Sequence, residues 1–386
     1  MSMHLAAYLI FALAMLACGL STGAQAYYLV ALALFALLIL SLISAAWALF
    51  TVRVEMKGVK PRVERGETLM TIFTVRHKSL LPVSAVRLRL SVPSAFQPFQ
   101  EISVSAPPFA GKVYRHRIVC PHRGSFEAGV TRVFASDLFG LVTLSRKSGM
   151  RLLRVEVTPR VPQDTPMALK AGDIGPEFLS RSDEDTASPS DVRKWQEGDP
   201  LKKVHWKLTM RKREIMVRVY EESARPDTLV IPDLTSVSAT TDQALSIEDA
   251  VCEACLGAAK AQLEAGYPVR MPLTSQSPAE ITGQFPQDLH SFVDALMRVK
   301  FDSPYEYEQV LTLMQRRMSR TGGAVVVTPH LTSRIADLAA RMQQSGVNTR
   351  VIWISDSSLD PSLEMVERLR MENVRVDRVD PWGPAA

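Results

Sequence analysis

The first fifty residues of the chain carry few polar positions, and two charge-free apolar runs occupy most of them. The second run, 26–50, would rise about 38 Å as a helix, which exceeds a bilayer hydrocarbon core of about 30 Å. The first run, 5–20, would rise about 24 Å and reaches bilayer thickness only by recruiting residues 21–24. The pattern predicts a transmembrane helical hairpin over 1–50, with helices at about 5–22 and 26–50.

Two other interpretations of this segment remain open. A hairpin buried inside a soluble protein would have to cover two neighbouring charge-free runs with protein, which is costly. A cleaved signal peptide would use "AQA" at 24–26, but a basic segment should precede its apolar core, and the first Lys or Arg of the chain is Arg53. The basic residues that follow the second run predict a cytoplasmic body, with or without cleavage of the first run.

Between 51 and 159 apolar residues recur at every second position, in runs separated by Gly, Pro and Ser. The runs include "TLMTIFTVRH", "AVRLRLSV", "KVYRHRIVC" and "LLRVEVTP". Alternation without helical spacing between the runs predicts an antiparallel, β-sandwich-like domain. Its inward face is set by Val86, Leu88 and Leu90 or by Val113, His116 and Ile118, depending on register.

The pattern changes twice beyond 159. Residues 160–226 are expected to be a connector, because their first half is aperiodic and rich in Pro, Gly, Ser and Asp. From 227 to 386, β-branched runs such as "TLVIPDL", "GAVVVTP" and "TRVIWIS" alternate with helical patterns. A first helix is expected over 246–266, from a Ser-x-x-Asp box to Gly266. This alternation predicts an α/β Rossmann-like three-layer domain, a parallel sheet with helices on both faces.

Charge and cysteine content add constraints on partners and compartment. A formal net charge of +5 over 386 residues is too small to indicate nucleic-acid binding, and it suits a protein beside anionic lipid. Four cysteines, one of them in the first apolar run, do not make a disulfide framework. Cys252 and Cys255 are expected to pack a helix against the sheet, since no further metal ligands accompany them. The chain contains no "GxxxxGK[ST]", "HExxH" or "GxSxG" motif.

Two glycine-containing motifs are expected to be turns of the β-domain. They are "HRGSFEAG" at 122–129 and "SDLFGL" at 136–141. Their glycines permit backbone angles closed to other residues, while the phenylalanines and leucines beside them are buried.

One stretch, "DVRKWQEGDPLKKVHWKLTMRKREIMVRVYEE" at 191–222, combines two tryptophans, a Gly-Asp-Pro turn, a histidine and many basic residues. Within it, 201–213 is predicted as a helical segment and 214–222 as a strand. His205 has no neighbouring nucleophile or second ligand, so we expect a packed or hydrogen-bonded structural role. Because acidic residues are interleaved with the basic ones, we expect a partner-facing surface in preference to a phosphate or single-strand site.

These motifs resemble the bacterial "domain of unknown function 58" family. The resemblance lies in the glycine motifs of the β-domain, in "R-x-W-x-x-GDP-x-x-x-V-HW-K-x-T-x-R" at 193–211 and in the "VRVYEE" that follows. In that family a membrane hairpin and a β-domain precede a hallmark segment, Arg-x-Tyr-x-x-Gly-Asp-x-x-Arg-x-Ile-x-Trp, which leads into a von Willebrand factor A-like fold. This chain departs from the family pattern at Trp195, in place of Tyr, and at Lys202 or Lys203, in place of Arg.

The resemblance implies a non-catalytic, membrane-tethered adaptor at the bacterial inner membrane, with its soluble domains facing the cytoplasm. Similar proteins are commonly encoded beside MoxR-type AAA+ ATPases and membrane proteins with transglutaminase-like domains, so the implied partner is one of these. The hallmark stretch is then the surface that meets the partner. Its assigned residues are Arg193, Trp195, Gly198, Asp199, His205, Trp206 and Arg211.

A von Willebrand factor A-like domain also raises the question of magnesium. Such domains, when they bind the ion, supply oxygen ligands from an Asp-x-Ser-x-Ser loop, a threonine and a later aspartate. Here Asp233 and Thr235 fit the first two loop positions, but Val237 occupies the third. The segment from Thr328 to His330 offers no carboxylate. We expect a degenerate loop and neither a metal nor another cofactor.

Two alternative functions draw on the same hallmark stretch. A hydrolase or phosphate-handling enzyme would use Asp199 and His205, with the basic cluster holding an anionic substrate, provided that both side chains converge in a pocket. A peripheral anionic-lipid-binding module would instead place Lys202 and Lys203 against lipid headgroups.

Overall fold

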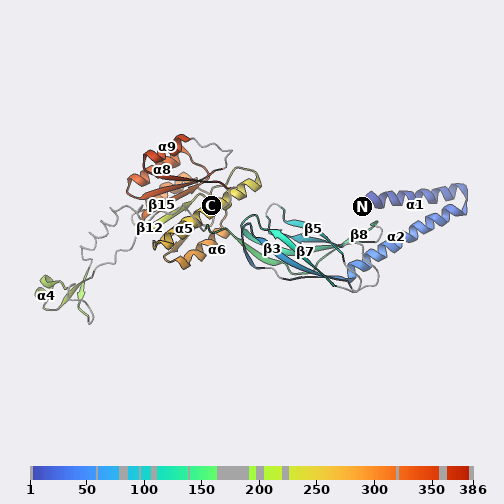
Figure 1. Ribbon diagram of the computed structural model, residues 1–386, viewed down its shortest axis with the longest axis horizontal. Coiled ribbons are helices and arrows are strands. Elements are labelled where there is room, and N and C mark those ends of the chain that lie inside the picture. The colour runs from blue at the N-terminus through green and yellow to red at the C-terminus, as the bar shows by residue number, and fades with distance from the viewer. Residues whose placement is uncertain are drawn as a thin grey trace. The chain divides into compact units, whose positions relative to one another are not determined.

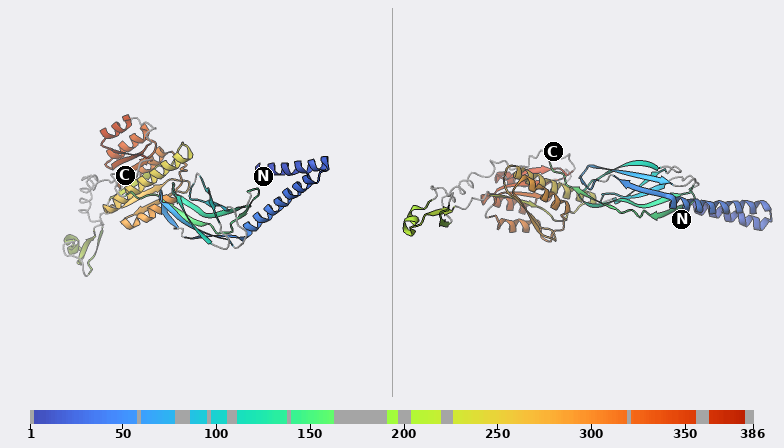
Figure 2. Two further views of the ribbon diagram at one scale, coloured as in Figure 1. Left: turned by 45° about the vertical axis from the view of Figure 1, so that its right-hand side comes forward. Right: turned by 90° about the horizontal axis from the view of Figure 1, so that it is seen from below.

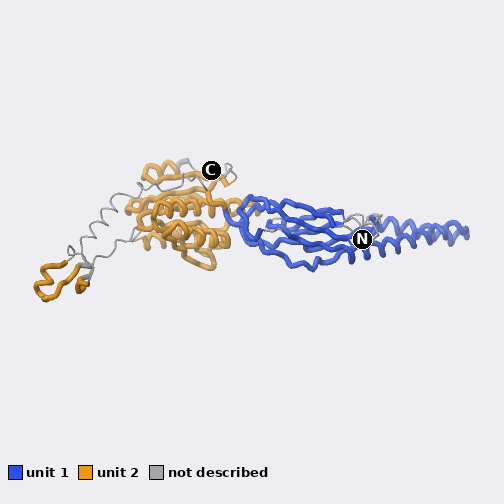
Figure 3. Tube along the Cα trace, turned by 60° about the horizontal axis from the view of Figure 1, so that its bottom comes forward, with its two compact units in different colours: residues 1–159 blue, residues 160–386 orange. Residues whose placement is uncertain are grey.

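The computed structural model of the protein describes residues 3–57, 60–77, 86–94, 97–105, 111–137, 140–162, 191–196, 204–219, 226–318, 321–355 and 363–381. The chain divides into two compact units, Met1–Pro159 and Arg160–Ala386 (Figure 3). Each unit has apolar cores of its own.

The first unit begins with two antiparallel apolar helices, α1 (Met3–Thr22) and α2 (Gln25–Thr51), which confirm the predicted helical hairpin (Figure 1). Gly23 has a φ of 66° in the turn between them, and its amide donates to the Gly19 carbonyl at 2.9 Å. The Tyr8 hydroxyl donates to the Leu34 carbonyl at 2.9 Å and ties the two helices together. Both helices are long and apolar enough to cross a membrane.

Two β-sheets that share one core follow the hairpin. The first sheet has the order β1-β3-β6, formed by β1 (Val52–Lys57), β3 (Thr68–His77) and β6 (Gly111–Val119). The second has the order β2-β9-β7-β4-β5, with β8 paired to β7, and comprises β2 (Arg62–Glu64), β4 (Val86–Ser91), β5 (Phe99–Val104), β7 (Gly124–Ser136), β8 (Thr143–Lys147) and β9 (Leu153–Thr158). β2 runs parallel to β9, so the pairing is mixed where we expected only antiparallel strands.

The inward face of the β-domain follows one of the two predicted groupings. Val86, Leu88 and Leu90 on β4 are all buried, as the alternation predicts. The other grouping was wrong, because Val113 is 57% exposed while Ile118 is buried. The two residues lie an odd number of positions apart on β6, and successive side chains of a strand point to opposite faces.

Residues 124–129 of the motif at 122–129 are not a turn, as we had expected, but the beginning of the 13-residue strand β7. This strand pairs with β9 as far as Ala128 and with β4 from Gly129 onwards. Gly129 has a φ of 156°, and a Cβ atom there would lie 2.9 Å from Cδ2 of Leu152. The second motif does contain a turn, in which Gly140 has a φ of 70° and its amide donates to the Asp137 carbonyl at 3.3 Å.

The second unit centres on a six-stranded sheet of order β14-β13-β12-β15-β16-β17, in which only β14 runs antiparallel to its neighbour. Its strands are β12 (Asp227–Pro232), β13 (Val269–Leu273), β14 (Ala279–Gly283), β15 (Thr321–Thr328), β16 (Asn348–Ile354) and β17 (Arg375–Val379). Its helices are α5 (Thr241–Glu264), the 3₁₀ helix η2 (Pro286–Asp288), α6 (Leu289–Arg298), α7 (Tyr307–Gln315), α8 (Ser333–Gln344) and α9 (Leu363–Met371). The predicted alternation of strands and helices is confirmed, whereas β13, β14, α6 and α7 had not been predicted.

Apolar side chains are buried on both faces of this sheet, because successive residues of a strand alternate between faces. Val230 belongs to one core with residues of α5 and α6, while Leu229 and Ile231 belong to another with residues of α7, α8 and α9. Figures 1 and 2 show helices on both sides of the strands. Cys252 and Cys255 are fully buried in the first core, which confirms their packing role, and burial raises the pKa of the Cys255 thiol.

Helix α5 corrects one predicted boundary. It begins at Thr241 and not at the Ser-x-x-Asp box, so Ser246 and Asp249 of that box are buried inside the helix. Gly266 follows the helix with a φ of 80°, where a residue with a Cβ would be strained.

Part of the segment assigned as a connector also forms secondary structure. β10 (Asp191–Lys194) and β11 (Met216–Val219) make a separate antiparallel pair, and α4 (Trp206–Lys212) lies between them along the chain. The helix predicted at 201–213 and the strand predicted at 214–222 are present as α4 and β11. The strand β10 had not been predicted. We refer to the described residues 191–196 and 204–219 as the hallmark module.

Candidate functional site

The hallmark module folds around a very small apolar core. Val204, Met216 and Val217 are each at most 4% exposed. Val204 forms an isolated bridge with Val217, so β11 is contacted by β10 and also by the residues that precede α4. Outside the strand pairs, the Trp195 amide donates to the Ile215 carbonyl at 2.9 Å.

His205 is a structural residue in this fold. It is the N-cap of α4, and its Nδ1 atom accepts a hydrogen bond from the Leu208 amide at 3.2 Å. A ring nitrogen that accepts an N–H bond carries no proton, so the neutral ring holds its proton on Nε2. The first amides of a helix lack partners inside the helix, and an N-cap acceptor satisfies one of them. The His205 amide donates to the Met216 carbonyl at 2.8 Å, which fixes the start of α4 on β11.

Thr209 provides a second link between α4 and β11. Its hydroxyl oxygen accepts a hydrogen bond from the Met216 amide at 3.1 Å. His205 and Thr209, two polar residues of the hallmark motif, therefore both form hydrogen bonds inside the module. The helix is short, and these contacts hold it in place where its own seven residues would not.

The outer surface of the module is apolar and basic. Trp206 is 64% exposed, and Met210, one helical turn later, is 81% exposed. Trp195 and Ile215 are also exposed. Basic side chains surround these positions at Lys207, Arg211, Lys212 and Arg213, all of them exposed. Sequence reasoning had not singled out Met210 or Ile215, although the four-residue spacing of Trp206 and Met210 places both on one helix face.

The remaining predicted residues of the motif divide into two groups. Arg193 is exposed on β10, and its Nη1 donates to the Lys194 carbonyl at 3.1 Å. Arg211 is exposed in the last turn of α4. The predicted residues Gly198, Asp199, Lys202 and Lys203 lie outside the described residues. The hydrolase hypothesis pairs Asp199, outside the described residues, with His205, whose Nδ1 accepts the Leu208 amide.

A second polar group lies at the carboxyl ends of the two central strands of the α/β sheet. Asp233 follows β12 and is 1% exposed. Its Oδ1 accepts hydrogen bonds from the Thr235 amide at 3.1 Å and hydroxyl at 2.6 Å, and its Oδ2 accepts one from the Thr328 hydroxyl at 2.7 Å. The chain leaves β12 toward β13 on one side and later returns to β15 on the other, so this is a topological switch point, where open α/β sheets bind ligands.

The side chains of this group offer few free ligands to a cation. Burial raises the pKa of the Asp233 carboxyl, although the hydrogen bonds from Thr235 and Thr328 and the nearby His330 act in the opposite direction. Both carboxyl oxygens are already used by hydroxyl and amide donors. Val237, at the third loop position, packs against the core next to α5. In the part of the chain that the structure describes, no cluster of three or more His, Cys, Asp or Glu side chains is present. The group does not fit Mg²⁺, which requires an octahedron of oxygen ligands.

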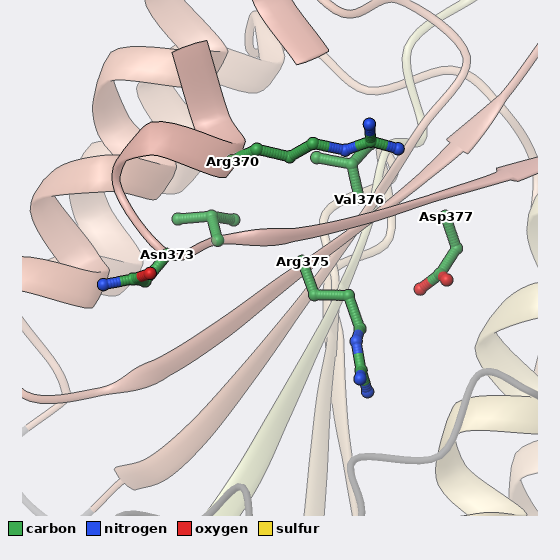
Figure 4. Close-up of a pocket in the computed structure, with 6 residues that line it drawn as sticks. Arg370, Asn373, Arg375, Val376 and Asp377 are labelled. Atoms are coloured by element: carbon green, nitrogen blue, oxygen red, sulfur yellow. The ribbon is translucent and has the colours of Figure 1, made fainter. Parts of the chain in front are cut away.

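The edge strand β17 borders a shallow hollow. Figure 4 shows Arg370 at the end of α9, Asn373 in the connection, and Arg375, Val376 and Asp377 on β17. Asp377 accepts a hydrogen bond from the Nε atom of Arg350, which is 1% exposed. The hollow is open, and its one carboxylate is engaged by a buried arginine, so it has no catalytic constellation.

Comparisons with known proteins give one family and several slight structural likenesses. Residues 191–377 match the model of a family described as "Protein of unknown function DUF58". No curated protein matches the chain.

Solved structures match the chain at low identity and low TM-score. One of them, Cwp6 from Clostridium difficile, is 8% identical over 86% of this chain and 53% of its own length, with a TM-score of 0.20. A CARDB domain from Pyrococcus furiosus, solved with di-metal ions, is 17% identical over 28% of this chain and 86% of its own length, with a TM-score of 0.21. A cohesin module of a Clostridium perfringens family 33 glycoside hydrolase is 11% identical over 28% of this chain and 96% of its own, at a TM-score of 0.19. A β-glucosidase from Listeria innocua is 13% identical over 28% of this chain and 16% of its own length, with a TM-score of 0.19. Likenesses this slight define neither fold nor activity.

Proposed function

We propose, from the premise that this chain belongs to the DUF58 family, that it is a membrane-anchored, non-catalytic adaptor whose hallmark module binds a protein partner. The partner that we propose is a MoxR-type AAA+ ATPase, with a transglutaminase-like membrane protein as the other member of such an assembly. The observation that carries the proposal is that the polar and the apolar residues of the module have different roles. Its polar residues His205 and Thr209 bond internally, while Trp206 and Met210 face outwards.

This difference favours binding over catalysis for a physical reason. Exposed tryptophan and methionine side chains lose water when a partner covers them, and tryptophan is enriched among the residues that dominate interface energies. The basic residues next to them favour an acidic partner surface and fast association with it. A hydrolytic role would need a free base and a pocket, whereas Nδ1 of His205 accepts the Leu208 amide.

We propose further that the α/β domain is von Willebrand factor A-like and that it has lost the metal function of such domains. The strand order, with the switch point between β12 and β15, supports the first part of this proposal. The position of Asp233 and Thr235 directly after β12 also supports it. The buried Asp233, whose two carboxyl oxygens both accept hydrogen bonds, supports the second part.

The proposed location is the bacterial inner membrane, with both helices of the hairpin crossing the bilayer and the rest of the chain in the cytoplasm. The length and composition of α1 and α2 support the membrane location. Exposed basic residues immediately after α2, among them Arg53 and Lys57, support the orientation under the positive-inside rule.

A direct binding measurement tests the adaptor function. Full-length protein in lipid nanodiscs is titrated with a purified MoxR-type ATPase from the same organism, and Kd is measured for the wild type and for Trp206→Ala/Met210→Ala. Loss of a buried tryptophan contact is expected to cost at least about 2 kcal/mol, which weakens binding about 30-fold.

The matched control is Met371→Ala, because Met371 is 82% exposed on the same unit but lies in α9. Its Kd is expected to equal that of the wild type. Equal binding by wild type and Trp206→Ala/Met210→Ala, with the hallmark module intact by hydrogen exchange, contradicts the assigned surface. Failure of the wild type to bind any such ATPase contradicts the proposed partner.

A further inference from the structure

The contact between α2 and the β-domain lies far along the helix. α2 has 27 residues and rises about 40 Å, so it exceeds a hydrocarbon core of about 30 Å. Ser41 lies ten residues before its end at Thr51, which corresponds to about 15 Å. The Ser41 hydroxyl donates a hydrogen bond to Oδ2 of Asp137, in the turn between β7 and β8. The β-domain therefore reaches back along the helix and does not hang from its last residue.

The contacting face of α2 is made of small residues. Ser41, Ala45 and Ala48 are buried, and this part of the helix contacts β7 and β8. Close to the helix end, Nη2 of Arg146 on β8 donates to the Val52 carbonyl at 2.6 Å. Asp137 is itself 2% exposed, and its Oδ1 accepts the Val142 amide at 2.9 Å. The β7–β8 turn and the second half of α2 thus form one packed structure.

The opposite face of the same helical segment is exposed and apolar. Leu42, Ile43, Trp47 and Phe50 are between 50% and 77% exposed. Their surface continues that of Leu32, Ile39 and Leu40 earlier in α2, which are also exposed. The exposed apolar surface is continuous along α2. A bilayer that surrounds the first half of the helix would therefore also bury the apolar face of the second half. Tryptophan is enriched at the level of the lipid headgroups, which suits Trp47.

Basic side chains lie at the same end of the β-domain. Arg53 lies two residues beyond the end of α2 and stands opposite Arg76 on β3, and both are exposed. Like charges directly opposite each other on two strands repel, and lipid phosphates at this level would relieve the repulsion. The outward positions of this sheet also carry Lys57, Arg115 and Arg117, against the single carboxylate of Glu55.

We propose that this end of the β-domain is itself a lipid-contacting surface. The β7–β8 turn lies at the boundary between headgroups and hydrocarbon. Arg53 and Arg76 lie more than about 15 Å farther along the axis of α2, on the aqueous side, and their long side chains extend back to the lipid phosphates. The occupant is an anionic bilayer, and a protein covering the same face is the competing outcome of the test. The inference rests on the proposed membrane anchorage. It adds to that proposal a defined position of the β-domain relative to the bilayer surface.

Depth-dependent fluorescence quenching tests the proposal on the full chain. Single cysteines at three exposed positions, in a Cys18→Ala background, carry an environment-sensitive fluorophore. The positions are Leu32 in α2, Thr143 at the start of β8, and Val119 at the end of β6. Val119 is eight residues from Gly111 at the membrane-proximal end of β6, or about 27 Å. The protein is reconstituted in vesicles of phosphatidylethanolamine and phosphatidylglycerol with spin labels placed near the headgroup or deep in the acyl chain.

The expected result separates the three positions. The Leu32 probe loses fluorescence to the deep label, the Thr143 probe to the shallow label, and the Val119 probe to neither. A Thr143 probe that behaves like Val119, while Leu32 is quenched, overturns the inference and leaves the membrane anchor intact. An unquenched Leu32 probe overturns the anchor itself. A Thr143 probe shielded from both lipid labels and from an aqueous quencher identifies a protein cover and also overturns the inference.

A charge-reducing pair tests the arginine contact. Arg53→Gln/Arg76→Gln is expected to lower the shallow quenching of the Thr143 probe, because the surface loses its phosphate contacts. Arg115→Gln/Arg117→Gln removes the same charge from the same sheet face, and it is expected to leave the quenching unchanged. Equal effects of the two pairs overturn the assignment of Arg53 and Arg76 to the phosphate level.

Discussion

Thr328, the last residue of β15, donates a 2.7 Å hydrogen bond from its hydroxyl to Oδ2 of Asp233, the residue that follows β12. This bond joins the ends of the two central strands of the α/β sheet. Thr328→Val keeps the side-chain shape and removes the donor, which leaves a buried carboxyl oxygen without this partner. We expect a loss of about 1–3 kcal/mol in the free energy of unfolding, measured by denaturant titration. Thr312→Val, at an exposed position of α7, is the control, and it is expected to cost less than about 0.5 kcal/mol.

Asp233 also gives the α/β domain a pH dependence. Burial raises its pKa above the unfolded value of 3.8, so at pH values between the two pKa values the folded state keeps a proton that the unfolded state releases. The stabilisation is complete below pH 3.8 and is lost as the pH rises through the folded pKa, with a slope of at most about 1.4 kcal/mol per pH unit. The side chain that Asp233→Asn introduces does not titrate. The stability of this variant is therefore expected to change less with pH in that window than the stability of the wild type. Hydrogen exchange of β12 and β15 between pH 4 and pH 8 measures the difference, and parallel profiles for the two proteins contradict the shift.

His205 offers a test of structural against catalytic use. His205→Ala removes the acceptor for the Leu208 amide, and we expect α4 to lose about 1 kcal/mol of local stability. His205→Asn supplies another good N-cap acceptor and is expected to retain most of it. Hydrogen exchange of the hallmark module reports both values. If His205 is structural, partner binding should follow the stability of α4 and survive in His205→Asn. If His205 acts as a base, the function that needs it should be lost equally in both variants.

His77 makes the β-domain sensitive to acid. It is 1% exposed, and neither of its ring nitrogens has a hydrogen-bond partner among the residues that the structure describes. Burial lowers its pKa below 6.5, so the folded state favours the neutral ring. Its contribution to stability is present above pH 6.5 and is lost as the pH falls through the folded pKa, because the unfolded chain takes up the proton first.

His77→Leu should therefore lose less stability than the wild type between pH 8 and pH 5. The measurement is hydrogen exchange of β1 and β3 at both pH values. His116→Leu is the comparison, since His116 lies half exposed on β6 with its Nε2 at 3.2 Å from Gln100 Oε1. If acid weakens wild type and His77→Leu equally, another group causes the sensitivity.

Gly129 is required by backbone geometry and by packing together. Its φ of 156° disfavours residues with a Cβ, and that atom would also lie 2.9 Å from Leu152 Cδ2. We expect Gly129→Ala to destabilise the β-domain by about 1–3 kcal/mol. Gly111→Ala is the matched control, because its Cβ would meet only the flexible Arg76 side chain, at 3.2 Å or more. Thermal unfolding of the full chain in detergent compares the two variants, and equal melting temperatures contradict the role given to Gly129.

The sequence by itself determined the kinds and order of many elements, although β10, β13, β14, α6 and α7 were not predicted from it. Two uninterrupted apolar runs predict two long apolar helices, and α1 and α2 follow them closely. Period-two alternation around Leu88 and β-branched runs such as the one ending at Thr328 identify strands from local letters alone. The hallmark motif identified the family from its own residues.

Tertiary structure alone decided what the polar residues do, because their partners are remote in sequence. Asp233 meets Thr328 only when β12 and β15 are neighbours, and Ser41 meets Asp137 only when the β7–β8 turn folds back on α2. His205 became a helix cap through the position at which α4 begins. Residues 124–129 became part of a strand because β9 and β4 pair with them, which their glycines do not reveal. Local patterns fix periodicity, whereas hydrogen-bond partners across sheets depend on topology, which no short stretch of sequence encodes.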